Sequence, residues 1–131
     1  MSQSNLARAE SINQLSVHKF GGSSLATAKC IRRVISILKQ HCSFVDAVVV
    51  SANGKTTDAL IEIIDLLGSD KGNALVAIET LVNEHTNLIS ELVSDPVKTQ
   101  LVTELKKDAL EITSAADSGI TESTSSDILA N

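Results

Sequence analysis

A short run near the start of the chain combines the residue types that bind phosphate. Residues 19–24 read Lys-Phe-Gly-Gly-Ser-Ser, and a long amphipathic stretch follows them. Glycines without a Cβ let the backbone turn sharply and let a ligand approach it closely. The start of the following helix would add unpaired N–H groups and the positive end of the helix dipole. The candidate phosphate ligands are Lys19, Gly21, Gly22, Ser23 and Ser24.

Taken alone, this pattern also fits a simple tight turn beside a solvated lysine. The standard nucleotide fingerprints do not settle the choice, because Gly-x-Gly-x-x-Gly is absent. The run Gly54-Lys55-Thr56 resembles the end of a P-loop, but Val49 stands where the first glycine of that motif is needed. The sequence therefore excludes a P-loop nucleotidase and leaves a different phosphate cradle open.

The elements around this run predict that it lies at one edge of a parallel sheet. Apolar, β-branched stretches predict strands over residues 15–20 and 44–51, and residues 47–50 read as a strand buried on both faces. Between them, apolar residues recur every three or four positions and predict a helix that Ser24 caps. A strand–helix–strand unit implies parallel strands with ligands at their carboxyl ends. Ser51 would thus lie beside the glycine run.

The rest of the chain reads as helices. Thr56 or Thr57 is expected to cap a helix that ends near residues 68–72. A longer helix follows from Asn73, and Ser94-Asp95-Pro96 is a typical helix restart. These two helices predict an antiparallel hairpin over residues 73–114. We expect residues 1–14 to form a flexible arm, Gly119 to stop the last helix, and residues 121–131 to form a loop or a short helix.

The histidines and cysteines offer weaker signals. His18 on a strand is better explained as a packing residue than as a catalyst, and His85 lies on an apolar helix stripe as a core residue. His41 is expected on the surface near a helix end. Cys30 and Cys42 have no metal-ligand spacing in the sequence, so both are expected to be reduced thiols.

Composition excludes several classes of protein. The 131 residues are 43% hydrophobic, which suffices for the core of one domain. Aromatic residues are only 2% and the formal net charge is -5, both of which argue against a nucleic-acid binder. No apolar run is long enough to span a bilayer, and the polar start does not resemble a signal peptide. The sequence predicts a cytoplasmic protein that binds neither nucleic acid nor membrane.

Two motifs carry a resemblance to a known family. The run from His18 to Ala26 resembles the opening signature of aspartokinases, and the run from Val48 to Asp58 resembles their second conserved strand and loop. The pair Lys29-Cys30 and the run Asp117-Ser118-Gly119-Ile120 resemble the kinase part of bifunctional aspartokinase/homoserine dehydrogenases. The resemblance covers most of the chain and is specific in the two motifs.

The resemblance implies an α/β fold, a partial amino-acid-kinase fold of three αβα layers, with two parallel strands in a βαβ unit plus a helical hairpin. It also implies transfer of the γ-phosphoryl group of ATP to the side-chain carboxylate of L-aspartate, with Mg²⁺. The product is 4-phospho-L-aspartate, the first step towards lysine, threonine and methionine.

The same resemblance implies roles for single residues. Lys19 would stabilise charge on the moving phosphoryl group, which is the main catalytic need of such a reaction. The N–H groups of Gly21 and Gly22, with Ser23 and Ser24, would hold phosphate oxygens. Thr57 would lie in the aspartate pocket and Ser51 beside the path of phosphoryl transfer.

Aspartokinases are several times longer than this chain, which ends about where their Gly-Glu substrate motif begins. We therefore expect residues 15–131 to be a truncated, amino-terminal portion of the catalytic domain, inactive alone. Two strands leave edges and an apolar face uncovered, which predicts a homo-oligomer. The alternatives are a stand-alone binding or regulatory module and a helical protein–protein interaction domain built on residues 73–114.

Overall fold

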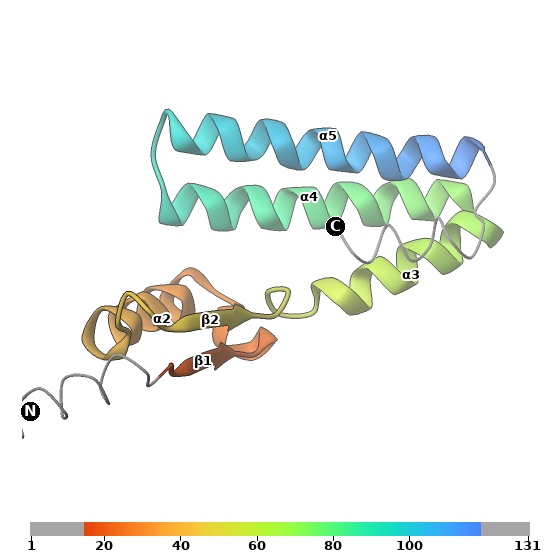
Figure 1. Ribbon diagram of the computed structural model, residues 1–131. Helices are drawn as coiled ribbons and strands as arrows, with labels where there is room; N and C mark the ends of the chain where they lie inside the picture. Colours follow the sequence, from red (N-terminus) through yellow and green to blue (C-terminus); the bar gives the residue numbers. More distant parts are fainter. Residues whose placement is uncertain (1–14, 119–131) are drawn as a thin grey trace, which may run out of the picture. The chain divides into compact units, whose positions relative to one another are not determined.

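The computed structural model describes residues 15–118, and these fall into two compact units (Figure 1). The β–α–β unit comprises the described residues up to Gly54, and the helical unit comprises those from Lys55 onward. The arm over residues 1–14, the stop at Gly119 and the segment over residues 121–131 lie outside the described residues. Within residues 15–118, no helix combines the length and apolarity needed to cross a membrane.

The β–α–β unit contains the predicted parallel strand pair. Strand β1 (Val17–Phe20) runs into a 3-10 turn, η1 (Gly22–Leu25), then helix α2 (Ala28–His41) and strand β2 (Ala47–Val50). The two strands are parallel neighbours. Their register places Val17 opposite Ala47 and Phe20 opposite Val50. The α/β class and the strand pairing are therefore confirmed, although both strands are shorter than the sequence predicted.

The second strand is shorter because a turn takes its first residues. The N–H of Asp46 donates to the carbonyl of Ser43 (3.1 Å), which closes a turn over Phe44 and Val45. The Asp46 carboxylate also accepts from the N–H (2.9 Å) and the hydroxyl (3.0 Å) of Ser43. These bonds hold Phe44 and Val45 out of the ladder, so the apolar run alone overestimated the strand.

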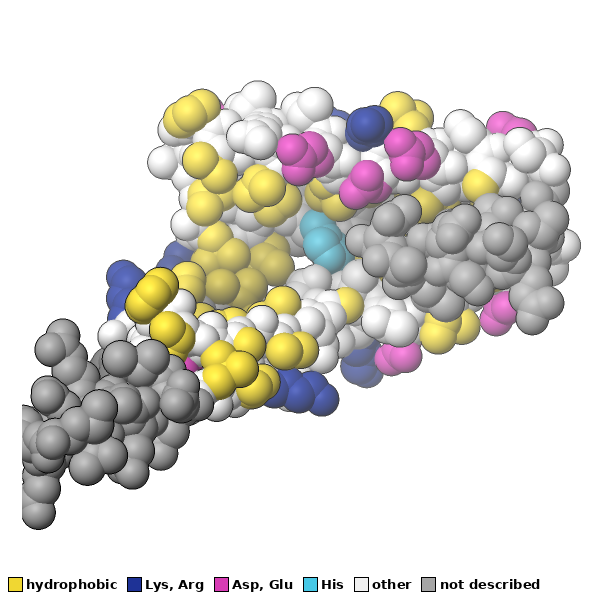
Figure 2. All heavy atoms as spheres, viewed as in Figure 1, with side chains coloured by type: hydrophobic (Ala, Val, Ile, Leu, Met, Phe, Trp, Pro, Cys, Tyr) yellow, Lys and Arg dark blue, Asp and Glu magenta, His cyan; other side chains and the backbone are white. Residues whose placement is uncertain are grey.

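The prediction of a strand buried on both faces is wrong. Val48, Val49 and Val50 are 43%, 47% and 58% exposed, because the sheet of the described residues has only two strands. Figure 2 shows hydrophobic side chains gathered where Figure 1 draws β1, β2 and α2. Alternation along β1 leaves Val17 and Lys19 exposed, whereas His18 and Phe20 on the opposite face are half-buried.

Helix α2 begins later than predicted and has a different cap. Ser24 does not cap it, because the N–H of Ser24 donates to the carbonyl of Gly21 (3.1 Å) within the 3-10 turn. The hydroxyl of Thr27 instead accepts from the N–H of Cys30 (3.2 Å), which satisfies one of the free donors at the helix start. The exposed His41 ends the helix, as predicted.

The helical unit consists of α3 (Thr56–Ser69), α4 (Lys71–Leu92) and α5 (Val97–Asp117). Helices α4 and α5 form the predicted hairpin (Figure 1). An ion pair between Lys71 and Asp117 joins the start of α4 to the end of α5. The most deeply buried side chains of this unit are Ile63, Ala74 and Ile78.

The caps of the helical unit differ in part from the prediction. Lys55 takes the cap position of α3 without a side-chain bond, so the predicted threonine cap is wrong. Asp70 alone separates α3 from α4, and its carboxylate accepts from the N–H of Asn73 (3.1 Å). A helix does restart after Ser94-Asp95-Pro96, and Asp95 accepts from the N–H of Thr99 (3.2 Å), but Pro96 takes the cap position of α5 instead of lying in its first turn.

Candidate functional site

The two loops at the carboxyl ends of the strands are tied together by backbone hydrogen bonds. Just past the strands, the N–H of Ser51 donates to the carbonyl of Phe20 (3.0 Å). Further along, the N–H of Gly54 donates to the carbonyl of Gly22 (2.8 Å). The glycine run after β1 and the loop after β2 thus lie together at one edge of the sheet, as the parallel topology predicted.

Two of the glycines in these loops are required by the geometry. A Cβ on Gly22 would lie 2.9 Å from the carbonyl oxygen of Gly54 and 3.0 Å from that of Ala52, which is closer than real Cβ contacts allow. Gly54 has a φ of +54°, in the left-handed region that side chains disfavour. Gly21, by contrast, has open space around it, with nothing within 4 Å of a Cβ placed there. Close packing of the two loops therefore depends on Gly22, while Gly21 leaves its own surroundings free for a ligand.

The predicted anion-binding groups lie on residues close to Gly21 in the chain. Gly21 precedes the 3-10 turn Gly22–Leu25, whose first N–H groups have no partner inside the turn. Ser23 and Ser24 are exposed on that turn, and Lys19 is exposed near the end of β1. The predicted donors belong to a 3-10 turn, not to the start of α2, which begins three residues after the turn ends. An amine, hydroxyls and free N–H groups at one edge of a sheet are suited to holding an anion.

The structure brings together most of the predicted site residues but not all of them. Ser51 is exposed in the loop after β2, within the β–α–β unit and beside the glycine run. Thr57 is exposed on the first turn of α3 and belongs to the helical unit. The predicted aspartate ligands Ser51 and Thr57 are thus divided between the units.

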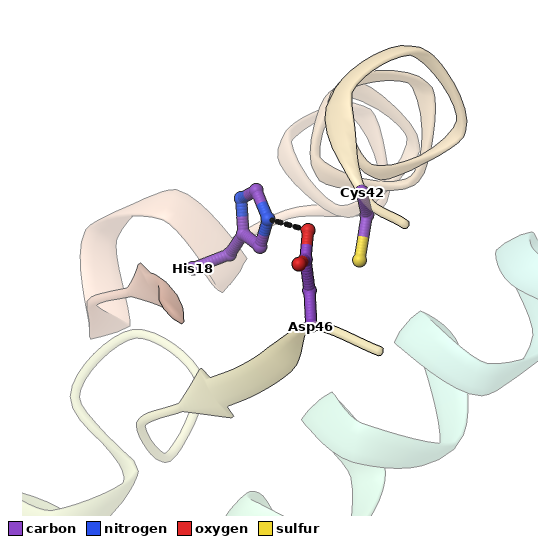
Figure 3. Close-up of side chains that lie close together, drawn as sticks. All are labelled: His18, Cys42 and Asp46. Atoms are coloured by element: carbon purple, nitrogen blue, oxygen red, sulfur yellow. Dashed lines mark hydrogen bonds and ion pairs between the residues drawn. The ribbon is translucent and has the colours of Figure 1, made fainter. Parts of the chain in front are cut away.

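A polar pair that sequence reasoning missed lies at the other end of the strands. His18 Nε2 is 2.8 Å from Asp46 Oδ2 (Figure 3), and the second oxygen of Asp46 also accepts from the N–H of Ser16 (3.3 Å). The hydrogen bond from His18, with those from Ser43, holds the pKa of the Asp46 carboxyl well below its usual range. The strand register carries the signal, because Asp46 stands two residues before Val48, the partner of His18. The pair connects β1 to the turn that precedes β2.

The helical unit contains a groove of about 330 Å³ among its three helices. Within it, Nδ1 of His85 donates to the carbonyl of Leu81 (2.9 Å), so Nε2 accepts from the hydroxyl of Thr56 (3.3 Å). His85 is half-buried with both ring nitrogens bonded, as expected of a packing residue. Acidic side chains follow α5 (Figure 2), and two of them line the groove. The groove is lined by Thr56, Leu60, Ile63, Ile78, Leu81, Val82, His85, Leu105, Asp108, Ala109, Glu111, Ile112 and Ala115.

Comparison with known proteins places these motifs in a family. Residues 14–124 match the model of the amino acid kinase family. The chain is 34% identical over 113 residues, 86% of its length, to "Bifunctional aspartokinase/homoserine dehydrogenase 2" of Escherichia coli (strain K12). It is 28% identical over 97 residues, 74% of its length, to the chloroplastic bifunctional aspartokinase/homoserine dehydrogenase of Daucus carota. The chain spans only 14% and 10% of the lengths of these two relatives.

Proposed function

Since the chain belongs to the amino acid kinase family, we propose that it is the phosphate-binding segment of an aspartate kinase. The reaction would move the γ-phosphoryl group of ATP to the side-chain carboxylate of L-aspartate and give 4-phospho-L-aspartate. The observation that carries the proposal is the close packing of the two carboxyl-end loops at Gly22, which leaves the space at Gly21 open. The printed names of the relatives, which contain "aspartokinase", support the choice of aspartate.

The residues of the β–α–β unit have separate roles in this proposal. Lys19 places its ammonium beside the phosphoryl group and offsets the charge that spreads over its oxygens in the transition state. The N–H groups of Gly21 and Gly22 and the hydroxyls of Ser23 and Ser24 hold the phosphate oxygens. Because the backbone N–H groups belong to the turn, they need little reorganisation when the substrate binds.

Two further residues are proposed for the substrate side of the reaction. The N–H of Ser51 donates to the carbonyl of Phe20, which supports a role for Ser51 beside the phosphate cradle. Thr57, on the first turn of α3, would contact aspartate. Mg²⁺ fits as a partner of the nucleotide, because it prefers oxygen ligands and is commonly held by substrate phosphates with few protein groups. The exposed hydroxyls of Ser23 and Ser24 offer oxygen atoms that Mg²⁺ can take as ligands.

We propose that these 131 residues bind phosphate without completing the transfer. The match covers only 14% of the E. coli relative, and residues outside this span would complete the nucleotide and aspartate pockets. The exposed valines of the two-stranded sheet also favour self-association into a homo-oligomer. Light scattering of the chain checks this, and a monomer would remove the second part of the proposal.

The proposed reaction is tested by measuring ADP release in the presence and absence of aspartate. The assay uses the full natural polypeptide that contains these residues. Lys19→Ala should lower kcat by about 10²-fold or more, because charge stabilisation is the largest catalytic contribution. KM for ATP should change less, since the contact strengthens in the transition state. Lys29→Ala, which removes an exposed lysine of α2, is the matched control and should retain turnover. Equal turnover in both variants would contradict the role of Lys19, and ADP release that ignores aspartate would contradict the substrate.

A further inference from the structure

A second cluster of reactive side chains lies in the β–α–β unit, apart from the phosphate cradle. His18 Nε2, Cys42 Sγ and a carboxylate oxygen of Asp46 all lie within 4.8 Å of one another (Figure 3). The three residues come from β1, from the end of α2 and from the position before β2. We propose that His18, Cys42 and Asp46 form a binding site for Zn²⁺. The proposed kinase reaction does not require this site.

The ligand types select the metal. Imidazole nitrogen, thiolate sulfur and carboxylate oxygen are the three donors that Zn²⁺ takes in proteins. Mg²⁺ and Ca²⁺ prefer oxygen and leave thiolates and imidazoles unbound, so the Mg²⁺ that accompanies a nucleotide would not occupy this site. Three protein ligands leave a fourth position for water or another small ligand.

The spacing of the ligand atoms is close to what a tetrahedral ion needs. Zn–N, Zn–O and Zn–S bonds near 2.0–2.3 Å imply separations between ligand atoms of about 3.3–3.6 Å. His18 Nε2 and Asp46 Oδ2 are already 2.8 Å apart and would separate by about 0.5 Å. The sulfur of Cys42 would move inward by about 1.5 Å at most, which side-chain rotation allows. The thiol of Cys42 makes only a weak contact with the carbonyl of Ser43 (3.5 Å), so little energy is lost when the sulfur moves.

The surroundings support the carboxylate as a ligand. Oδ1 of Asp46 accepts from the Ser43 hydroxyl (3.0 Å) and the Ser16 N–H (3.3 Å), and Oδ2 accepts from the Ser43 N–H (2.9 Å). These bonds fix the plane of the carboxylate with Oδ2 toward His18. Hydrogen-bonded carboxylates of this kind orient metal ligands in known sites. The side chains of His18 and Asp46 are 19% and 6% exposed, so the site is largely shielded but open to an entering ion.

Metal binding changes the protonation of two ligands. When the neutral imidazole of His18 binds the metal through Nε2, its proton lies on Nδ1. Bonds from the metal to His18 Nε2 and Asp46 Oδ2 then replace the hydrogen bond between these two atoms. Cys42 releases its thiol proton to solvent, because the thiolate is the ligand. The ion would then join β1, the end of α2 and the turn before β2.

The test is titration of the 131-residue chain under reducing conditions with Zn²⁺ alone, followed by calorimetry, and with Co²⁺, followed by absorption. The wild-type chain should bind one ion and show the charge-transfer band of a cobalt–thiolate bond. Cys42→Ser should abolish the band and weaken binding by about 100-fold or more. The control is Cys30→Ser, which removes the other cysteine on the same helix and should bind like the wild type.

A second pair of variants keeps the test decisive if Cys42→Ser does not fold. His18→Gln should weaken Zn²⁺ binding to a similar degree, whereas His41→Gln, at the exposed end of α2, should not. Excess Mg²⁺ should not displace the bound ion. Absence of saturable binding in the wild type, or equal binding by the variants and their controls, would show that His18 and Asp46 form a hydrogen-bonded pair only.

Discussion

The two units of the chain hold their structure in different ways. In the β–α–β unit the strands are largely exposed and the buried side chains are Leu25, Ala28 and Val34, around the 3-10 turn and α2. In the helical unit, long helices pack through Ile63 and Ile78. The first unit therefore owes the shape of its loops to glycines and backbone hydrogen bonds, whereas the second owes its shape to apolar packing. We expect phosphate binding in the β–α–β unit, where small changes of the backbone alter the shape of the loops most.

The largest stability effect is expected in the helical unit. Ile63 is 1% exposed on α3, so Ile63→Ala should lower the free energy of unfolding of this unit by about 2–5 kcal/mol. Ile61 on the same helix is 45% exposed, and Ile61→Ala should change it by about 0.5 kcal/mol or less. Amide hydrogen exchange, resolved along the chain, measures the loss of stability in each unit. Equal effects of the two variants would mean that packing at Ile63 does not hold these helices together.

A smaller effect, confined to the β–α–β unit, is expected from the loop glycines. Gly22→Ala forces a Cβ against two backbone oxygens and should destabilise this unit by about 1–3 kcal/mol. Gly21→Ala is the matched control, since its Cβ meets nothing within 4 Å and its φ of -78° suits any residue. Hydrogen exchange of the loop after β2 reports the difference. If Gly21→Ala were the more damaging of the two, the geometry of the loops would be wrong.

The smallest effect separates the two candidate caps of α2. Thr27→Ala removes the hydroxyl that accepts from the N–H of Cys30 and should cost about 1 kcal/mol of stability. Ser24→Ala should be nearly neutral for stability, because that hydroxyl lies on the exposed 3-10 turn and caps no helix. Denaturant unfolding followed by the helical signal compares them. A larger loss of stability in Ser24→Ala than in Thr27→Ala would mean that Ser24 caps α2, as the sequence alone predicted.

The sequence predicted those features that depend on local pattern. The apolar stripes and the Ser94-Asp95-Pro96 signal were sufficient for the helical hairpin, and the strand–helix–strand order was sufficient for parallel pairing. The glycine run and Ser51 were correctly placed at one edge, because carboxyl ends of parallel strands meet there.

The sequence could not predict features set by competition between nearby groups. Several hydroxyls precede α2, and only the formation of the 3-10 turn decides that Thr27, not Ser24, becomes the cap. The strand over residues 44–51 was too long because the Asp46 carboxylate stabilises a turn instead. The pairing of His18 with Asp46 depends on the strand register, which the apolar pattern does not specify.

The central claim is that the loops of the β–α–β unit bind phosphate, and amide NMR during titration of the chain with Mg·ATP tests it most directly. We expect saturable shifts at the amides of Gly21, Gly22, Ser23 and Ser24 and in the loop after β2, with α4 and α5 unaffected. Lys19→Ala should weaken this response, and Lys29→Ala should leave it unchanged. Shifts confined to the helical unit, or a response that Lys19→Ala does not alter, would contradict the claim.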